Sequence, residues 1–295
     1  MRIALTGATG LIGGRLRTHF AKQGHEVICL SRRSVSQPGW YPWEPESGPP
    51  PREALLGSEA VVHLAGEPVA QRWSAEVKRR IVSSRVDATR ALVTAFKALP
   101  APPRVLVCAS AIGYYGSRGD ELLPESASAG TGFLAQTCFE WEQTARAAAE
   151  FGVRVVSPRI GVVLDRVGGA LAKMLPPFRA GLGGPIAGGQ AWMSWIHLHD
   201  LVRMIAWVLE TPAVSGPLNA VAPNPVRNEE FTQALAAALR RPAFFPVPAL
   251  ALKLLYGEMA EIVLASQRVI PERAGQSGFQ YDWPELAPAL RDLIC

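Results

Sequence analysis

The stretch "TGATGLIGG" at residues 6–14 constrains the fold more than any other part of the chain. A short apolar strand precedes it, and residues 11–24 follow with helical periodicity that ends at a glycine. The glycine spacing has three uses: Gly7 permits a tight turn, Gly10 lets a phosphate approach the backbone, and Gly13 lets the helix pack closely. Because the free N–H groups of a helix N-terminus attract phosphate, this stretch predicts a dinucleotide-binding strand–loop–helix unit.

Strand-like and helix-like stretches alternate after this loop. The runs "HEVICLSR", "EAVVHLAG", "RVLVCAS" and "VRVVSPRIGVVL" have the composition of strands. Residues 74–99 and 134–150 have helical periodicity, and residues 34–52, rich in Pro, Gly and Trp, are expected to form a loop. The alternation predicts an α/β fold, a Rossmann-type doubly wound parallel sheet with a small mixed C-terminal lobe.

The character of the sequence changes after residue 165, where glycine and proline become frequent. We expect residues 1–165 to form the nucleotide-binding domain, with elements at about 192–222 returning to it. Residues 166–295 should then form a small lobe on the substrate side. Such a lobe would cover the carboxyl edge of the sheet, where folds of this class bind their ligands.

The end of the second strand indicates which dinucleotide is preferred. A fold that prefers NAD carries an acid there for the ribose 2′-hydroxyl, whereas this chain has "CLSRR". Ser31, Arg32 and Arg33 offer a hydroxyl and guanidinium groups suited to a 2′-phosphate. The sequence therefore predicts NADP(H); the alternative is that the arginines are only exposed surface residues.

Composition and charge exclude several other classes of protein. The net charge is +5, but the basic residues form short, scattered groups without interleaved aromatics, which argues against nucleic-acid binding. The four cysteines lie far apart, as expected in a reducing compartment. No apolar run approaches the ~18 residues of a membrane span. His197 and His199 have no third ligand at matching spacing, so no metal is expected. We therefore expect a cytoplasmic protein without membrane partners.

Several motifs together resemble those of extended short-chain dehydrogenase/reductases, the superfamily of NAD-dependent epimerases and dehydratases: "TGATGLIGG", "VVHLAGEPV", "SAIGYYG" and "WIHLHDLV". The segments "SSRVDAT", "GLGGPIAGG" and "SQRVIPE" look more narrowly like its atypical epimerase-like subfamily of YfcH type. The resemblance covers nearly the whole chain. It implies a Rossmann domain, bound NADP(H) and a subfamily C-terminal segment at about 247–293. It implies no particular small-molecule substrate, and we expect a monomer or a homodimer.

The resemblance also assigns cofactor contacts by position. It places the 2′-phosphate at Arg32 and caps the helix after "WIHLH" with Asp200. It places the pyrophosphate at Gly7, Thr9, Gly10, Leu11 and Ile12. It places other parts of the cofactor at Leu64, Ala65, Gly66, Glu67, Arg85, Gly161, Val162 and Val163. For Leu64 and Val162, ordinary packing at a strand end is the alternative.

The catalytic pattern of active relatives is missing. Those proteins place a serine four residues before a Tyr-Gly pair, and later a YxxxK pair that supplies the acid/base tyrosine and the lysine that lowers its pKa. Here Ala111 stands at the serine position, and Ser110, one residue away, is kept as a cofactor contact. Counting from Glu142 puts Leu134 and Cys138 at the tyrosine and lysine positions. All three catalytic residue types are therefore changed.

Three hypotheses follow for the chemistry. The protein is an NADP(H)-dependent oxidoreductase or epimerase-like enzyme in which Tyr114 or Tyr115, its pKa lowered by an arginine or by the nicotinamide charge, donates the proton. Glu67 is another candidate donor. In the second hypothesis Cys138 acts as a thiol, although a buried, unreactive side chain is the better interpretation. In the third, the protein binds NADP(H) without catalysis, as a sensor or interaction protein.

Overall fold

A parallel sheet of eight strands forms the centre of the protein. The computed structural model describes residues 1–32 and 35–294. Within them the sheet follows the order β12-β8-β5-β4-β1-β2-β3, with the short β6 beside β8, and every pairing is parallel. These strands are β1 (Arg2–Thr6), β2 (Glu26–Ser31), β3 (Trp40–Pro42), β4 (Ala60–His63), β5 (Val105–Cys108), β6 (Ser110–Ala111), β8 (Arg154–Ile160) and β12 (Gly216–Ala220).

The chain winds outward from the middle of the sheet in both directions. From β1 it continues to β2 and β3 on one side, and from β4 it continues to β5, β8 and β12 on the other. The predicted Rossmann-type doubly wound fold is therefore confirmed. The order reverses between β1 and β4, and the carboxyl ends of the strands at such a switch point form the usual ligand site.

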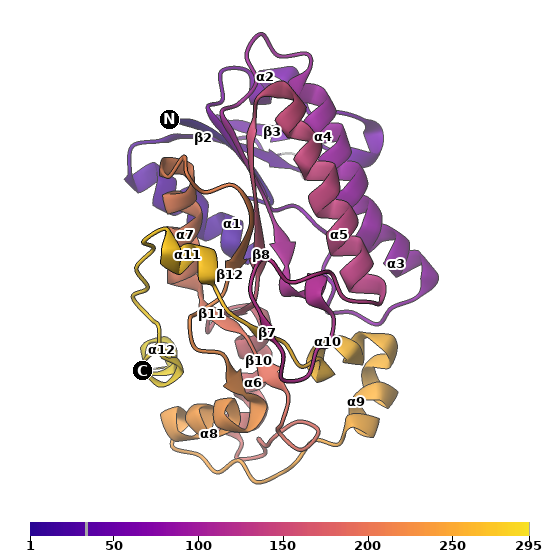
Figure 1. Cartoon of the computed structure of the whole chain (residues 1–295), viewed down its shortest axis with the longest axis vertical. Helices are drawn as coiled ribbons and strands as arrows, with labels where there is room; N and C mark the ends of the chain where they lie inside the picture. The colour runs from indigo at the N-terminus through magenta and orange to yellow at the C-terminus, as the bar shows by residue number, and fades with distance from the viewer. Residues whose placement is uncertain (33–34, 295) are drawn as a thin grey trace.

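Alternation of side chains along the strands gives the sheet two apolar faces. On one face Ile3 and Leu5 pack with α1 and α7, and on the other Ala4 packs with α2, α4 and α5. Figure 1 shows α1 and α7 on one side of the sheet and α3, α4 and α5 on the other. These helices are α1 (Leu11–Lys22), α2 (Arg52–Leu55), α3 (Ala75–Val82), α4 (Ala88–Phe96), α5 (Phe133–Arg146) and α7 (Leu198–Glu210).

A separate apolar cluster builds the lobe at the foot of Figure 1, where α6, α8 and α12 pack around the fully buried Trp195. The chain enters the lobe after β9, returns to the main sheet with α7 and β12, and enters the lobe again with α8. The domain boundary at residue 165 stays a prediction. The remaining elements are β7 (Leu122–Leu123), β9 (Val162–Leu164), α6 (Gly169–Arg179), β10 (Trp192–Met193), β11 (Trp195–His197), β13 (Val226–Arg227), α8 (Asn228–Leu239), α9 (Ala249–Tyr256), α10 (Ala260–Leu264), β14 (Arg268–Val269), α11 (Glu272–Gln276) and α12 (Leu286–Ile294).

Two predicted elements have a different form. The expected loop at 34–52 contains β3, because the backbone around Trp40 pairs with β2 in parallel register. The strand expected over 153–164 is divided into β8 and β9 at Gly161. A Cβ at Gly161 would lie 2.6 Å from the carbonyl oxygen of Ser194, so the approach of β11 requires glycine at this break.

The helix expected over residues 74–99 is present but changes its winding. A π-helical turn, Ser83–Asp87, lies between α3 and α4. Its hydrogen bonds span five residues, whereas those of an α-helix span four. Single π-turns within α-helices occur often at functional sites, because they displace side chains from the regular helical positions. This turn faces the cavity that is described in the next subsection.

The start of α7 also differs from the prediction. His197, rather than Asp200, caps this helix, because its Nδ1 accepts the N–H of His199 at 3.1 Å. Asp200 is fully buried and accepts the backbone N–H groups of Asp282 and Trp283 at 3.0 and 2.9 Å. The carboxylate therefore fastens the C-terminal segment to α7.

Candidate functional site

The glycine loop joins β1 to α1 at the switch point of the sheet. Gly7 has a φ of +68°, and a Cβ there would lie 2.9 Å from the carbonyl carbon of Leu64. A Cβ on Gly13 would lie 2.2 Å from the carbonyl oxygen of Gly7, so α1 approaches the loop too closely for any side chain. Gly10 begins α1 without a side-chain cap, so the first N–H groups of the helix are free for a ligand. The geometry fits a bound phosphate group.

A threonine and a histidine fix the loop to the neighbouring strand. Thr6 Oγ1 accepts the backbone N–H groups of Leu64 and Ala65 at 3.1 and 3.2 Å. The same oxygen lies 2.7 Å from Nδ1 of the buried His63. Burial, with a smaller effect of the Arg85 charge, lowers the pKa of His63 to about 4, so the ring is neutral. Thr6 thus holds together the two strand ends that flank the switch point.

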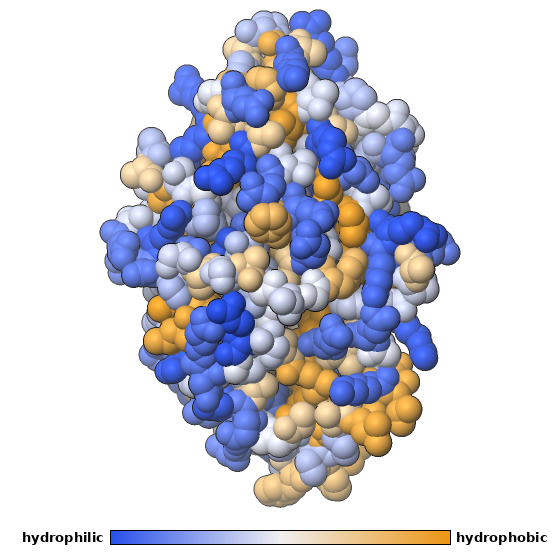
Figure 2. All heavy atoms as spheres, turned by 45° about the vertical axis from the view of Figure 1, so that its right-hand side comes forward, coloured by the Kyte–Doolittle hydropathy of each residue, from blue (hydrophilic) through white to orange (hydrophobic). Residues whose placement is uncertain are grey.

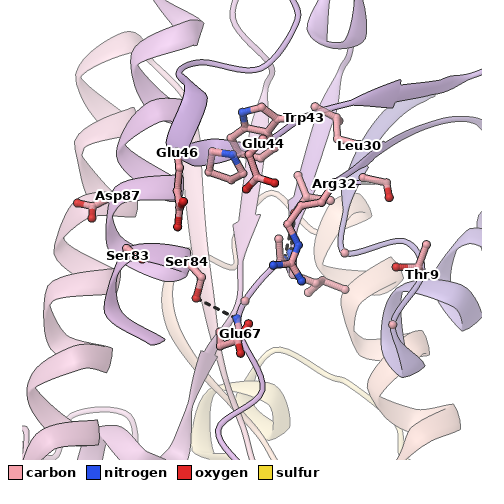
Figure 3. A pocket seen from close by; sticks show the side chains of 18 residues that line it. Thr9, Leu30, Arg32, Trp43, Glu44, Glu46, Glu67, Ser83, Ser84 and Asp87 are labelled. Carbon is pink, nitrogen blue, oxygen red and sulfur yellow. Dashed lines mark hydrogen bonds between the residues drawn. The ribbon is translucent and has the colours of Figure 1, made fainter. Parts of the chain in front are cut away.

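A cavity of about 820 Å³ opens beside the glycine loop, within the size range of cofactor sites. Figure 3 shows the side chains that converge on it from the ends of β1, β2 and β4, from the segment after β3 and from the π-turn. The predicted cofactor contacts that line this cavity are Gly7, Thr9, Gly10, Ser31, Arg32, Leu64, Ala65, Gly66 and Glu67.

The basic side of the cavity lies at the end of β2. Arg32 is exposed and points into the cavity, beside Ser31 in the chain (Figure 3). The carboxylates on this wall, Glu44 and Glu46, come from the segment after β3 and not from the β2 end. Arg33, which was predicted to act with Arg32, lies outside the described residues. A guanidinium at this position fits a phosphate on the ribose.

The π-turn directs a half-buried arginine at the segment after β4. Arg85 Nη1 donates to the carbonyl oxygen of Glu67 at 3.0 Å, and Ser84 Oγ accepts the N–H of Glu67 at 2.9 Å. The guanidinium lies so close to Gly66 that a Cβ there would be 3.1 Å from Arg85 Cζ. Its other neighbour is the Trp141 ring, 5.3 Å away. Arg85 therefore lies directly behind the cavity wall rather than in the wall itself.

The other predicted cofactor contacts do not line the cavity. The side chains of Leu11 and Ile12 pack against the core and do not line the cavity. Ser110 is buried and donates to Glu142 Oε1 at 2.7 Å, which occupies its hydroxyl. The N–H of Val162 donates to the carbonyl oxygen of Ser194 at 2.8 Å. This contact fits the alternative in which Val162 only packs at a strand end.

A buried polar network fills the place where a proton donor was sought. Arg159 forms two hydrogen bonds of 2.8 Å to the Glu142 carboxylate, and its Nη1 donates to the hydroxyl of Tyr115 at 2.8 Å. That hydroxyl in turn donates to Asn219 Oδ1 at 2.7 Å. Burial alone would lower the pKa of Arg159, but the hydrogen bonds and the charge of Glu142 outweigh burial and raise this pKa. The Arg159 side chain therefore pairs with a mostly buried carboxylate.

The network removes Tyr115 as a proton donor at ordinary pH. Its side chain is fully buried, and burial raises its pKa to about 12, although Arg159 acts in the opposite direction. We expected an arginine to lower this pKa, but desolvation outweighs the charge. Tyr114 is only partly buried, and its ring lies 3.4 Å from Arg159 Cζ. Of the two tyrosines, Tyr114 is the one that remains accessible.

The start of α5 carries no acid or base at the expected positions. Leu134 and Cys138 lie against Gly113, within 3.5 and 3.8 Å of the position of a Cβ there. Cys138 is 5% exposed, and burial raises its pKa to about 11, which agrees with an unreactive side chain. Glu67 keeps a partly exposed carboxylate that accepts from Gln71 Nε2 at 3.0 Å and lines the cavity.

Sequence reasoning missed one wall of the cavity. Trp43, Glu44 and Glu46 belong to the segment expected to be a loop, and no local pattern connects that segment to the glycine loop. Ser83 and Asp87 line the cavity from the π-turn, beside Glu46 (Figure 3), and a π-turn has no signature in the spacing of apolar residues. The acidic residues Glu44, Glu46 and Asp87 are the only feature of these segments from which a polar site could have been predicted.

Neither a metal-ligand cluster nor a membrane-spanning helix is found among the described residues. No three of their His, Cys, Asp and Glu side chains are grouped so that they could hold a metal ion. Within 1–32 and 35–294, every helix is too short or too polar to cross a bilayer. The candidate functional site of the described chain is the cleft beside the glycine loop.

Comparison with known proteins agrees with this architecture. Residues 3–221 match the NAD dependent epimerase/dehydratase family, and residues 247–293 match a domain of unknown function, DUF1731. The chain is 42% identical to the chloroplastic epimerase family protein SDR39U1 homolog of Arabidopsis thaliana, over all of this chain and 87% of the relative. It is 36% identical to epimerase family protein YfhF of Bacillus subtilis, over all of this chain and 98% of the relative.

Solved structures are similar over the same length. The crystal structure of human epimerase family protein SDR39U1 with NADPH has a TM-score of 0.90 and 36% identity, covering all of this chain and 99% of that chain. A nucleoside-diphosphate sugar epimerase from Corynebacterium glutamicum has a TM-score of 0.82 and 33% identity, and the likeness covers 58% of that chain. The chain thus belongs to the NAD dependent epimerase/dehydratase family and carries that family's DUF1731 segment at its C-terminal end.

Proposed function

We propose that the protein binds NADP(H) beside the glycine loop and acts on a small molecule as an oxidoreductase or epimerase-like enzyme. The observation that carries this proposal is Arg32, which points into the same cavity as the glycine loop from the end of β2. At that position a fold that prefers NAD carries an acid, and a guanidinium favours the 2′-phosphate of NADP(H). The NADPH of the human relative supports the same choice.

NADP(H), when bound, supplies hydride transfer to or from the substrate. The N–H groups at the start of α1, including those of Leu11 and Ile12, are proposed to hold the pyrophosphate. Gly66 and the Arg85 guanidinium behind it are proposed to shape the ribose side. Ser110 and Val162 are weaker proposals, because the hydroxyl of one and the N–H of the other already bond within the protein. The three buried free cysteines, Cys29, Cys108 and Cys138, support a reducing compartment such as the cytoplasm.

The proton donor is proposed to be Tyr114 or Glu67. Tyr114 is partly exposed and has a guanidinium against its ring, and Glu67 presents a carboxylate to the cavity. Tyr115 and Cys138 are poor donors, because burial raises both of their pKa values. Tyr114→Phe and Glu67→Gln each remove one ionisable group and nearly keep the shape of the side chain, so together they distinguish the two candidates.

A second candidate function is a non-catalytic NADP(H)-binding sensor or interaction protein. The observation in its favour is the packing of the side where a proton donor was sought: Leu134 and Cys138 lie against Gly113, and Tyr115 is buried. A sensor requires the glycine loop and Arg32 but no proton donor. It would also have to bind NADPH and NADP+ with clearly different affinities, because only a difference between the two redox states carries a signal.

The experiment is a titration of the protein with NADPH, NADP+ and NADH, together with Arg32→Ala and the exposed control Arg104→Ala. We expect NADPH to bind more tightly than NADH by at least ~1 kcal/mol, a factor of about 5, and only the Arg32 variant to lose this preference. Equal binding of NADPH and NADH would refute the cofactor assignment.

A second measurement separates the two candidate functions. The protein is mixed with NADPH and a panel of carbonyl compounds and nucleotide sugars, and the nicotinamide absorbance is followed. Turnover that Tyr114→Phe or Glu67→Gln reduces at least ~100-fold supports the enzyme. Absence of turnover together with unequal NADPH and NADP+ affinities supports the sensor.

A further inference from the structure

The lobe exposes an apolar surface that the cofactor site does not use. The segment after α8 carries Phe244 and Phe245, whose exposed fractions are 81% and 56%. An aromatic side chain has roughly 150–250 Å² of surface, so these two rings leave on the order of 300 Å² in contact with water. That area alone is comparable to the largest apolar patch on a typical monomer, about 300–600 Å².

Helix α9 continues this surface. Its leucines Leu250, Leu254 and Leu255 are 67%, 72% and 63% exposed, and Leu252 is the one residue of α9 that is buried. A helix of a water-soluble lobe normally turns its leucines inward and its polar residues outward. We call Phe244, Phe245 and these three exposed leucines the lobe apolar surface. Figure 2 shows hydrophobic residues gathered at the lower right of the molecule, at the end where the lobe lies.

The charges next to this surface are mostly basic; of the two exposed acids that follow α9, Glu258 pairs with Lys78, and Glu261 lies on α10. Between residues 240 and 256 the charged residues are Arg240, Arg241 and Lys253, and there is no acid. All three are exposed, and Arg179 is exposed nearby, because the chain at Gly181 approaches Pro242. Within the described chain these arginines have no ion pair to neutralise them. The surface therefore combines exposed aromatic and leucine side chains with an unneutralised basic edge.

We propose that the lobe apolar surface docks on an anionic lipid surface. Apolar side chains that enter the boundary between headgroups and acyl chains, with basic residues at the headgroup level, are the recurring chemistry of peripheral membrane binding. The inference goes beyond the proposed function and does not depend on it. It revises the expectation of no membrane partner, because the absence of a long apolar run tests only whether a segment spans the bilayer.

The alternative occupant, a second copy of the chain, fits the charges less well. A two-fold interface places the same surface of both copies in contact. Arg240, Arg241 and Lys253 of the two copies would then approach one another with few acids to pair with them, because Glu258 already pairs with Lys78 and only Glu261 is left beside α9. An anionic lipid surface supplies the missing negative charge, and the exposed leucines need no matching pocket there.

The test is partition of the full-length protein onto vesicles of phosphatidylcholine with and without phosphatidylglycerol, measured by flotation. We expect binding to the anionic vesicles that weakens as salt is raised. The variant Phe244→Ser/Phe245→Ser should reduce the partition coefficient at least ~tenfold, and Arg179→Glu/Arg241→Glu should reduce it about tenfold on anionic vesicles. The matched control is Leu56→Gln, an exposed leucine of similar chemistry after α2.

Two results would overturn the proposal. One is a wild-type protein that stays in solution with the anionic vesicles, including the case in which it forms a dimer that the phenylalanine variant dissociates. The other is equal partition of wild type and the phenylalanine variant. NADPH titration of each variant shows that it is folded, because none of the changed residues lines the cofactor cavity.

Discussion

The two sides of the cleft differ in the chemical groups that form them. We call the side beside the glycine loop the cofactor half, and the side where a proton donor was sought the reactive half. On the cofactor side, the glycine loop exposes its backbone, Thr6 joins the ends of β1 and β4, and a cavity remains beside them. On the reactive side, large side chains fill the space, and Arg159, Glu142 and Tyr115 satisfy one another's hydrogen bonds. The cofactor half therefore leaves space for a ligand, whereas the side chains of the reactive half bond to one another and stabilise the fold.

This difference explains how a family member can keep its cofactor site while the usual catalytic residues are changed. The cofactor half depends on backbone geometry, which a few glycines fix. The reactive half depends on side-chain identity, and here Leu134 and Cys138, at the positions where the sequence analysis expects the acid/base pair, pack against Gly113. The polar atoms there belong to a closed network, so chemistry would have to use groups at its edge, such as Tyr114.

The largest expected effect comes from breaking the network in the reactive half. Arg159→Met leaves the Glu142 carboxylate, 11% exposed, without its partner, so the free energy of unfolding should fall by about 3–5 kcal/mol. Denaturant unfolding measures this loss. The control Arg90→Met removes an exposed pair with Asp87 and should cost less than about 1 kcal/mol.

A double variant sharpens the same point. Arg159→Met/Glu142→Leu removes both charges and should recover much of the loss, because no charge is then buried alone. If the single variant loses no more stability than the Arg90 control, the network is not the stabilising feature that its burial indicates.

The second effect is a pH dependence in the cofactor half. Burial lowers the pKa of His63 to about 4 from an ordinary 6.5, so folding favours the neutral ring. The stability from this group is fully present above pH 6.5 and is lost as pH falls toward 4, by roughly 3 kcal/mol. Unfolding measured from pH 7 to 4 should show this slope, and His63→Asn, which keeps an acceptor for Thr6, should reduce it. An unchanged slope in the variant would assign the effect to other groups.

The smallest effect tests the close approach in the glycine loop. Gly13→Ala places a Cβ 2.2 Å from the carbonyl oxygen of Gly7, so we expect a loss of about 1–3 kcal/mol and weaker NADPH binding. Gly14→Ala, one residue later in the same helix, meets no atom closer than 3.8 Å and should be neutral or stabilising. Thermal unfolding and cofactor titration of both variants measure the contrast. Equal behaviour of the two alanines would contradict the packing described here.

The sequence predicted the parts of the molecule that local patterns determine. The glycine loop, the alternating elements and the doubly wound sheet follow from spacing and apolar periodicity, and the structure confirms the sheet. Burial was harder to predict. Tyr115 follows a strand end and looked accessible, but Asn219, distant in the chain, encloses its hydroxyl. Asp200 looked like a cap, but it bonds to residues that follow it by more than eighty positions. Such contacts leave no local signal.

The return of the chain to the main sheet has a consequence during synthesis. Strand β8 ends at Ile160, and its outer neighbour β12 begins only at Gly216. At about 5–20 residues per second, a nascent chain spends roughly 3–10 s with the apolar outer edge of β8 unpaired. An unpaired strand edge can pair with the strands of other chains. Aggregation of this protein during translation is therefore expected to begin at β8, and a slow stretch of translation between these two strands would increase it.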